Sequence, residues 1–231
     1  MIEITPTDIP LEEFTRRIQK KEPFTFSRWG DGEWRSVMGK KNGANCDGHP
    51  FFPEMCRELQ QVLLSKPPYL MGMQQLAMRE FGDWIRNWLE QANLGDIPWV
   101  ESDVFHKAAH KGYLDPFVEV LRKRRTVIVG PEHLMRAQPL LNFDKYVSVP
   151  TTNAYLEKQR IVKDALACVD DKSPYTIFSI SASMPAEIIV DELWKEIGER
   201  HAIVDFGSLW DQYVGVKSRS YMRAGTAPLK R

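Results

Sequence analysis

The stretch Thr126-Val127-Ile128-Val129-Gly130 decides the fold class, because a run of β-favouring residues that ends in glycine is typical of a buried strand. Two later stretches have the same character: residues 175–180 (Tyr-Thr-Ile-Phe-Ser-Ile) and residues 202–207 (Ala-Ile-Val-Asp-Phe-Gly). Segments with helical spacing of their apolar residues separate these strands. Strands that alternate with helices are joined by right-handed crossovers into a largely parallel sheet. We therefore expect an α/β fold: a Rossmann-like domain whose sheet is flanked by helices.

The same alternation extends from this stretch toward both ends of the chain. Further strands are predicted at 24–27, 69–73 and 147–150. The helical segments that connect the strands are predicted at 10–21, 53–65, 78–92, 113–124, 133–141, 155–169 and 185–197, and a further helix is expected to start at 33–38. No repeat or Gly/Ser-rich linker interrupts the pattern, so residues 1–231 are expected to form a single domain with a basic tail at 216–231.

Composition excludes several classes of protein. The 31 Lys and Arg balance the 31 Asp and Glu, so the broad positive field of a protein that binds nucleic acid mainly through phosphates is missing. Three cysteines without a CxxC spacing suggest neither a disulfide framework nor a thiolate zinc site. The start of the chain lacks the pattern of a signal peptide, and no apolar run approaches the ~18 residues that span a bilayer. We expect a cytoplasmic protein that does not insert into membranes.

Small, polar and acidic residues follow the predicted strands. In an open parallel sheet, the ligand lies beyond the carboxyl ends of the strands, where these segments converge. The segments are 28–33, 130–133, 150–153, 181–185 and 207–211. The sequence therefore predicts a binding site at one edge of the sheet.

Asp31 and Glu33 are the sharpest pair at this edge. They stand on either side of Gly32, and Gly30 precedes them, so a tight turn can bring both carboxylates inward as oxygen ligands for Mg²⁺ or Mn²⁺. The alternative is a surface turn in which Asp31 caps a helix and Glu33 favours the positive N-terminus of that helix.

The segment 181–186 (Ser-Ala-Ser-Met-Pro-Ala) is a second candidate. Small residues before a helix that starts at proline leave backbone N–H groups free to hold a phosphate. The segment lacks a Walker lysine and the GxGxxG spacing. An ordinary helix start with Ser183 as its cap is the alternative.

Four more features allow either a functional or a purely structural interpretation. The loop 45–50 (Asn-Cys-Asp-Gly-His-Pro) offers Asp47 or His49 as a base, or is a simple turn. His106 and His110 have no third metal ligand and are expected at the surface. The cations at 122–125 indicate a solvated helix end, and the basic tail either clamps an acidic ligand or frays.

The segment Phe26-Ser27-Arg28-Trp29-Gly30-Asp31-Gly32-Glu33 resembles the "R-F-G-D-G-E" signature of the GT-D-type glycosyltransferases. Trp29 stands where that pattern usually has Phe. Later segments are similar to family segments in the same order, so the resemblance spans roughly residues 24–215, although the loop 45–50 has no confident counterpart. The segments are 130–133, 149–155, 181–185 and 205–209.

The resemblance implies a metal-dependent transferase whose Asp-x-Glu pair, here Asp31 and Glu33, binds Mn²⁺ or Mg²⁺ together with the diphosphate of a nucleotide sugar. Together with the edge residues it yields a hypothetical site. Arg28 and the segment that contains Ser181, Ser183 and Met184 are expected to bind the phosphate oxygens. The turn with Gly30 and Gly32 is expected beside them. Nucleoside contacts are assigned to Thr152 and Asn153. Asp205, Asp211, Glu132 and His49 remain alternative bases for an acceptor hydroxyl.

The expected function is transfer of a hexose such as glucose from a nucleoside-diphosphate sugar, with UDP favoured, to an acceptor hydroxyl. The acceptor is either a glycan or a 5-hydroxymethylpyrimidine in DNA; zero net charge favours the glycan, whereas the basic tail keeps DNA open. The alternatives are a noncatalytic nucleotide-sugar-binding module and a metal-dependent phosphoester hydrolase. The sequence does not fix the oligomeric state.

Overall fold

A computed structural model of the protein describes residues 2–40, 43–45, 48–170 and 172–218. The strands are β1 (Phe24–Trp29), β2 (Leu70–Met73), β3 (Val100–Glu101), β4 (Thr126–Gly130), β5 (Lys145–Ser148), β6 (Ile177–Ile180) and β7 (Ala202–Asp205). The α-helices are α1 (Leu11–Lys20), α2 (Asp31–Val37), α3 (Pro53–Leu64), α4 (Gln75–Gln91), α5 (Val104–Lys111), α6 (Asp115–Leu121), α7 (Gln138–Leu141), α8 (Lys158–Leu166) and α9 (Ala186–Ile197). Three 3-10 helices complete the described part: η1 (Glu132–Ala137), η2 (Ala154–Glu157) and η3 (Asp211–Val214).

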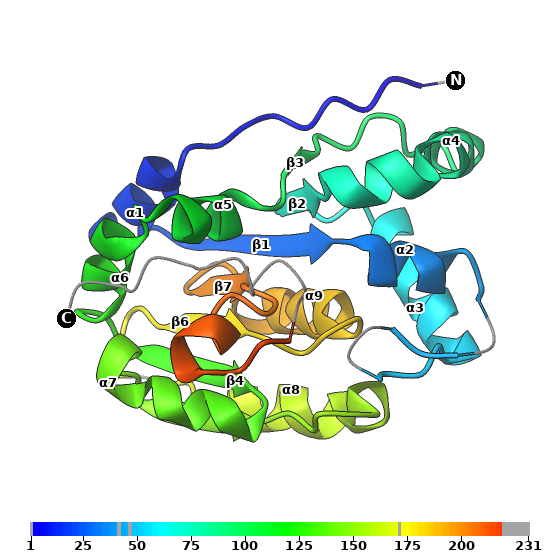
Figure 1. Cartoon of the computed structure of the whole chain (residues 1–231). Helices are drawn as coiled ribbons and strands as arrows, with labels where there is room; N and C mark the ends of the chain where they lie inside the picture. The colour runs from blue at the N-terminus through cyan, green and yellow to red at the C-terminus, as the bar shows by residue number, and fades with distance from the viewer. Residues whose placement is uncertain (1, 41–42, 46–47, 171, 219–231) are drawn as a thin grey trace.

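The strands form one parallel sheet in the order β3-β2-β1-β7-β6-β4-β5. Helices cover both faces: α2, α3, α4, α8 and α9 pack on one, and α1, α5, α6 and α7 on the other (Figure 1). The prediction of an α/β, Rossmann-like fold is confirmed, with every described strand parallel. Among the described residues, no helix is both long and apolar enough to cross a bilayer.

The two apolar cores follow from alternation along the strands. In β4, Val127 and Val129 join the core beneath α8 and α9, whereas Ile128 between them joins the core beneath α6 and α7. All three side chains are fully buried. Because both faces of a central parallel strand are covered, such a strand is a continuous apolar run, which is why residues 126–130 identified the sheet from sequence.

The order of the strands determines where a ligand can bind. From β1 the chain proceeds through β2 to one edge of the sheet, and from β4 to β5 at the other edge. β6 and β7 then fill the middle. The chain therefore leaves the neighbouring strands β4 and β6 in opposite directions, and a crevice opens at the carboxyl ends of such a pair. In Figure 1 the arrowhead of β1 points toward α2, which marks that side of the sheet.

Several element boundaries differ from those predicted. The fifth strand is Lys145–Ser148 rather than 147–150, because its register with β4 pairs Gly130 with Ser148 and leaves Pro150 beyond the strand. The helix expected at 113–124 is shorter, Asp115–Leu121, and starts with Pro116 in its first turn. The two-residue strand β3 and the helix α5 were not predicted.

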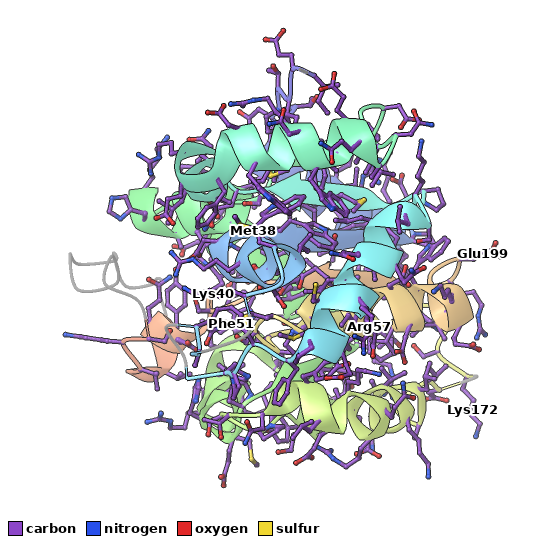
Figure 2. All side chains as sticks on the ribbon, turned by 90° about the vertical axis from the view of Figure 1, so that its right-hand side faces the viewer. Met38, Lys40, Phe51, Arg57, Lys172 and Glu199 are labelled. Atoms are coloured by element: carbon purple, nitrogen blue, oxygen red, sulfur yellow. The ribbon has the colours of Figure 1, made fainter. Side chains whose placement is uncertain are left out.

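The connection after α2 brings the loop 43–50 back toward the sheet. Ala44 and Pro50 form an antiparallel bridge, and the Phe51 N–H donates to the Gly43 carbonyl. Figure 2 labels Met38, Lys40 and Phe51 in this region. The Lys40 ammonium lies 5.7 Å from the centroid of the buried Phe51 ring. His49 is held by Asn45: the Asn45 N–H donates to the His49 carbonyl, and the His49 N–H donates to Oδ1 of Asn45.

Candidate active-site cleft

A cleft of about 470 Å³ lies at the carboxyl ends of β4, β5, β6 and β7. It spans β4 and β6, the pair of strands that the chain leaves in opposite directions. Its volume falls in the range of sites for small molecules and cofactors. The polar lining includes His49, His133, Thr151, Ser181, Ser183 and Asp211.

The segment between β6 and α9 forms one wall of the cleft. The Ser181 side chain is 93% buried (7% exposed), and its hydroxyl oxygen has no hydrogen-bond partner among the described residues. Ser183 adopts a φ of 57°, in the left-handed region, and its hydroxyl accepts a hydrogen bond of 2.8 Å from the Asn45 amide. Pro185, not Ser183, is the N-cap residue of α9 and provides no side-chain cap. No side chain at the N-cap position therefore caps the N-terminus of α9, which begins shortly after this wall of the cleft.

The first turn of α2 packs behind that wall. A Cβ on Gly32 would lie 3.2 Å from Cγ of Met184, so the close approach of the turn to the α9 segment favours glycine. The Gly30 N–H donates to Oε2 of Glu33 at 2.9 Å, which is one half of a capping box; Gly30 has no side chain to supply the other half. Oδ2 of Asp31 lies 3.8 Å from the Arg35 guanidinium. The two carboxylates therefore have different partners at one helix start.

Three carboxyl groups, which we call the acidic cluster, gather at this end of the sheet: Glu33, Asp205 and Glu187. Burial raises the pKa of Glu33 to about 7, and the charges of Asp205 and Asp31 add to this effect. Burial also raises the pKa of Asp205, against the opposing charge of Arg28. Burial, followed by the charges of Glu33 and Asp205, raises the pKa of Glu187 well above its usual value.

Glu187 is the deepest member of the acidic cluster. It is completely buried in the first turn of α9. Neither oxygen has a partner of ordinary hydrogen-bond geometry among the described residues, although Asp205 lies close enough for the two groups to influence each other's proton. Sequence analysis missed this residue, because an acid in the first turn of a helix is an ordinary surface feature.

Arg28 supplies the positive charge beside the acidic cluster. Its Nη2 donates to Oδ1 of Asp103 at 3.0 Å, and its Nε donates to the Ser102 carbonyl at 3.1 Å. Burial alone would raise the pKa of Asp103, but the Arg28 guanidinium and His106 hold that pKa below its usual value. Arg28 thus links the ends of β1 and β3, and it does not line the cleft.

Beside the wall that contains Ser181, His133 and Asp211 form a pair that sequence analysis did not identify. Nε2 of His133 lies 2.7 Å from Oδ1 of Asp211, and the Ser218 hydroxyl donates to the other carboxylate oxygen. His133 follows β4, and Asp211 follows β7. The two residues are 78 positions apart in the sequence. Both had been noted as edge residues, but only the strand order shows that they meet.

The structure separates the predicted site residues into three groups. Those that line the cleft are His49, Ser181, Ser183 and Asp211. Those that lie behind it or at the β1–β7 side are Arg28, Gly30, Asp31, Gly32, Glu33, Met184 and Asp205. Glu132, Thr152 and Asn153 are exposed and are not part of the lining, although Thr152 lies near Gly48, 3.8 Å from where a Cβ would stand.

Two predicted features fall partly or wholly outside the described residues. Cys46 and Asp47 of the loop 45–50 are among them, as is the basic tail from Arg219 onward. The described part of that tail, Val216 to Ser218, lines the cleft and includes the exposed Lys217.

The donor chemistry at the start of α2 suits a hard divalent cation, because carboxylate oxygens are the ligands that Mg²⁺ and Mn²⁺ prefer. Burial and mutual repulsion hold Glu33 and Glu187 toward their protonated forms, and a cation beside Glu33 would favour the charged form of that carboxyl group. Within the described residues, no group of three or more His, Cys, Asp or Glu side chains is already arranged to hold a metal.

Comparison of the chain with protein-family models, with curated proteins and with solved structures gives no match.

Proposed function

We propose that the protein is a metal-dependent glycosyltransferase that transfers a hexose from a nucleoside-diphosphate sugar to an acceptor hydroxyl. One observation carries the proposal. A cleft of about 470 Å³ at the reversal point of the sheet has a buried, unpartnered serine hydroxyl at a helix start, with an Asp-Gly-Glu turn packed directly behind it. The resemblance of residues 26–33 to the GT-D signature supports the same function and favours a UDP-glucose type of donor.

The donor diphosphate is assigned to the wall formed by Ser181 and Ser183. The N-terminus of α9 carries a partial positive charge, and its free N–H groups hold anions. The Ser181 hydroxyl offers a donor that the protein itself leaves unused. Lys217, exposed at the rim, adds a positive charge.

The metal is assigned to Asp31 and Glu33. A divalent cation bound there would neutralise the negative charge that develops on the departing diphosphate. Gly32 contacts Met184, the neighbour of Ser183, so the turn that bears both carboxylates adjoins the diphosphate wall. The Asp31–Arg35 contact is long, at 3.8 Å, and side chains that are about one-third exposed hold it weakly.

A glycan is the acceptor that the charge balance favours, since equal numbers of acids and bases provide no general attraction to DNA. The cysteines also fit the cytoplasm as the compartment, because Cys56 and Cys168 are free thiols.

Donor cleavage tests the proposal. The protein is incubated with Mn²⁺ and a panel of UDP-, GDP- and dTDP-sugars, with and without glycan acceptors or hydroxymethylated DNA, and free nucleotide is measured. We expect nucleotide release, and loss of release in Asp31→Ala and in Glu33→Ala with the fold retained. Asp83→Ala, at an acid whose side chain is 83% exposed on α4, is the matched control and should retain wild-type rates.

Other outcomes separate the competing functions. UDP binding without release from any donor indicates a noncatalytic binding module. Cleavage of simple phosphoesters without sugar transfer indicates a hydrolase. Salt-sensitive retention on duplex DNA, with transfer to hydroxymethylated bases, identifies DNA as the acceptor. Wild-type rates in both acid variants contradict the assigned metal site.

A further inference from the structure

We propose that His133 is the general base that removes the proton from the acceptor hydroxyl, and that Asp211 positions its imidazole. This inference rests on the proposed glycosyltransferase function and names the base that the sequence left open among Asp205, Asp211, Glu132 and His49.

The fold brings the two side chains to the same wall of the cleft. His133 lies in η1, directly after β4, and Asp211 opens η3, shortly after β7. Strand β6 separates these two strands in the sheet, and η1 and η3 pack together across its end. The result is a short contact of 2.7 Å between Nε2 of His133 and Oδ1 of Asp211.

The hydrogen bonds define which nitrogen of His133 acts as the base. An ionised carboxylate only accepts hydrogen bonds, so Nε2 must carry the proton that it donates to Asp211. The second oxygen of Asp211 accepts from Ser218, which holds the carboxylate in place. In the neutral ring Nδ1 then bears the lone pair, and it has no hydrogen-bond partner among the described residues. The His133 side chain is 21% exposed and lines the cleft.

The dyad adjoins the wall assigned to the diphosphate. Gly130, the last residue of β4, lies so close to Ser181 that an added Cβ would stand 3.3 Å from Cβ of Ser181. The segments that bear Ser181 and His133 thus leave neighbouring strands, about 5 Å apart. We place the anomeric carbon of a sugar whose phosphate is held at Ser181 between that phosphate and His133, because the two segments are neighbours.

The step balances without any redox partner. The acceptor O–H proton passes to Nδ1 of His133 while the acceptor oxygen forms a bond to the anomeric carbon. The bond from that carbon to the diphosphate oxygen breaks, and its electron pair leaves with the nucleoside diphosphate. Asp211 stabilises the imidazolium that forms. A single displacement of this kind inverts the anomeric configuration.

The charged groups around the dyad define the background of a pH profile. Lys217 and His49 line the same cleft, Ser218 and Asp211 lie beside His133, and Glu132 and Arg136 flank it on η1, exposed to solvent. The contributions of His49 and His133 to the pH profile are therefore distinguished by mutation and not by pH alone.

The experiment uses the full chain, Mn²⁺ and a donor sugar that the wild type cleaves, with water as the acceptor. The variants are His133→Gln, His133→Ala, Asp211→Asn and, as a matched control, His110→Gln at an exposed position on α5. Nucleotide release gives kcat and KM, and calorimetric titration gives the dissociation constant of UDP for each variant. Far-ultraviolet circular dichroism verifies the fold.

We expect His133→Gln to lower kcat by about 100-fold or more, the usual contribution of a general base, with UDP affinity unchanged. The acidic limb of the pH–rate profile should vanish, and added imidazole should restore turnover to His133→Ala. Asp211→Asn should lower kcat and shift that limb while KM stays near the wild-type value, as a positioning role requires. His110→Gln should match the wild type.

Weaker UDP binding in His133→Gln with kcat unchanged would overturn the inference and assign the pair to nucleoside recognition. Equal release by wild type and His133→Gln, or retention of anomeric configuration in the product, would also overturn it while leaving the transferase proposal in place. Absence of release from every donor by the wild type would overturn both.

Discussion

The charged groups differ in their surroundings between the two sides of the edge at which the strands end. At the ends of β1 and β7, Asp205 and Glu187 are buried, Glu33 and Arg28 are partly exposed, and these groups satisfy one another in part inside the protein. At the ends of β4 and β6, the charged and polar groups line an open cleft, and some have no partner. The comparison indicates that Arg28 and Glu187 in the first region set stability, whereas the second region sets binding of the donor. Glu33, which we assign to the metal, is the exception in the first region.

Replacement of Arg28 should have the largest effect on stability. Arg28→Met leaves Asp103 without its guanidinium partner and Asp205 without an opposing charge, in a region where the Arg28 side chain is 14% exposed. Removal of one partner of a buried pair costs about 3–5 kcal/mol. The free energy of unfolding, measured with urea, should fall by that amount. Arg35→Met, on the more exposed surface of α2, is the control and should cost about 1 kcal/mol or less. Equal losses in the two variants would contradict the division.

Gly207→Ala should be the next most damaging change. Gly207 has a φ of +52°, and a Cβ there would lie within 2.2 Å of Nη1 of Arg28, which its contacts with Ser102 and Asp103 hold in place. Gly215 has a φ of +79° but open space around its Cβ position. Gly215→Ala should therefore cost only the left-handed strain, about 1–2 kcal/mol, and Gly207→Ala distinctly more. Equal unfolding free energies would show that Arg28 moves freely.

Glu187→Gln should make stability less dependent on pH. Burial raises the folded-state pKa of Glu187, so the folded chain keeps a proton that the unfolded chain releases near the ordinary pKa. The stability from this proton is complete at acid pH and is lost as the pH rises through the folded-state pKa, by about 1.4 kcal/mol per pH unit. In urea titrations, the free energy of unfolding of the variant should therefore rise relative to that of the wild type from pH 5 to pH 8. Glu12→Gln, at an exposed position of α1, should follow the wild type. Parallel curves for wild type and Glu187→Gln would contradict the assignment.

Ser181→Ala should have the smallest effect and separate binding from stability. The Ser181 hydroxyl has no partner in the described part of the protein, so its loss should leave the unfolding free energy nearly unchanged. UDP affinity should fall about 10-fold, the value of roughly one hydrogen bond of 1.4 kcal/mol. Ser36→Ala removes another buried, unpartnered hydroxyl, on α2 and outside the cleft, and should leave UDP affinity unchanged. Equal UDP affinity in both variants would remove Ser181 from the binding wall.

The sequence predicted the sheet well because its central strands are covered on both faces. Val127 to Val129 had to be apolar whatever surrounds them, and the same holds for Ile177, Phe178 and Ile180 and for residues 202–204. The strand β3 has two residues and α5 lies close behind it, so neither has enough length for a periodic pattern. Where a strand ends depends on its register with the neighbouring strand, which is why β5 ended two residues before the predicted position.

Only those parts of the candidate site that lie within a single loop could be predicted from the sequence. The segment of Ser181 and Ser183 and the turn of Asp31 and Glu33 follow strands directly, and both lie at the expected edge. The His133–Asp211 pair depends on the strand order, which local sequence does not specify. The roles of Arg28 and Glu187 depend on burial at the ends of β1 and β7, because an arginine after a strand and an acid at a helix start are commonly exposed.

A crystal structure of the protein with UDP and Mn²⁺, with an anomalous difference map at the manganese edge, locates the metal and the diphosphate relative to Asp31, Glu33 and Ser181. The account predicts a manganese peak between the carboxylates of Asp31 and Glu33 and the diphosphate, with the phosphate oxygens against Ser181 and the start of α9. A manganese peak away from those two carboxylates, or UDP bound outside the cleft, would contradict it.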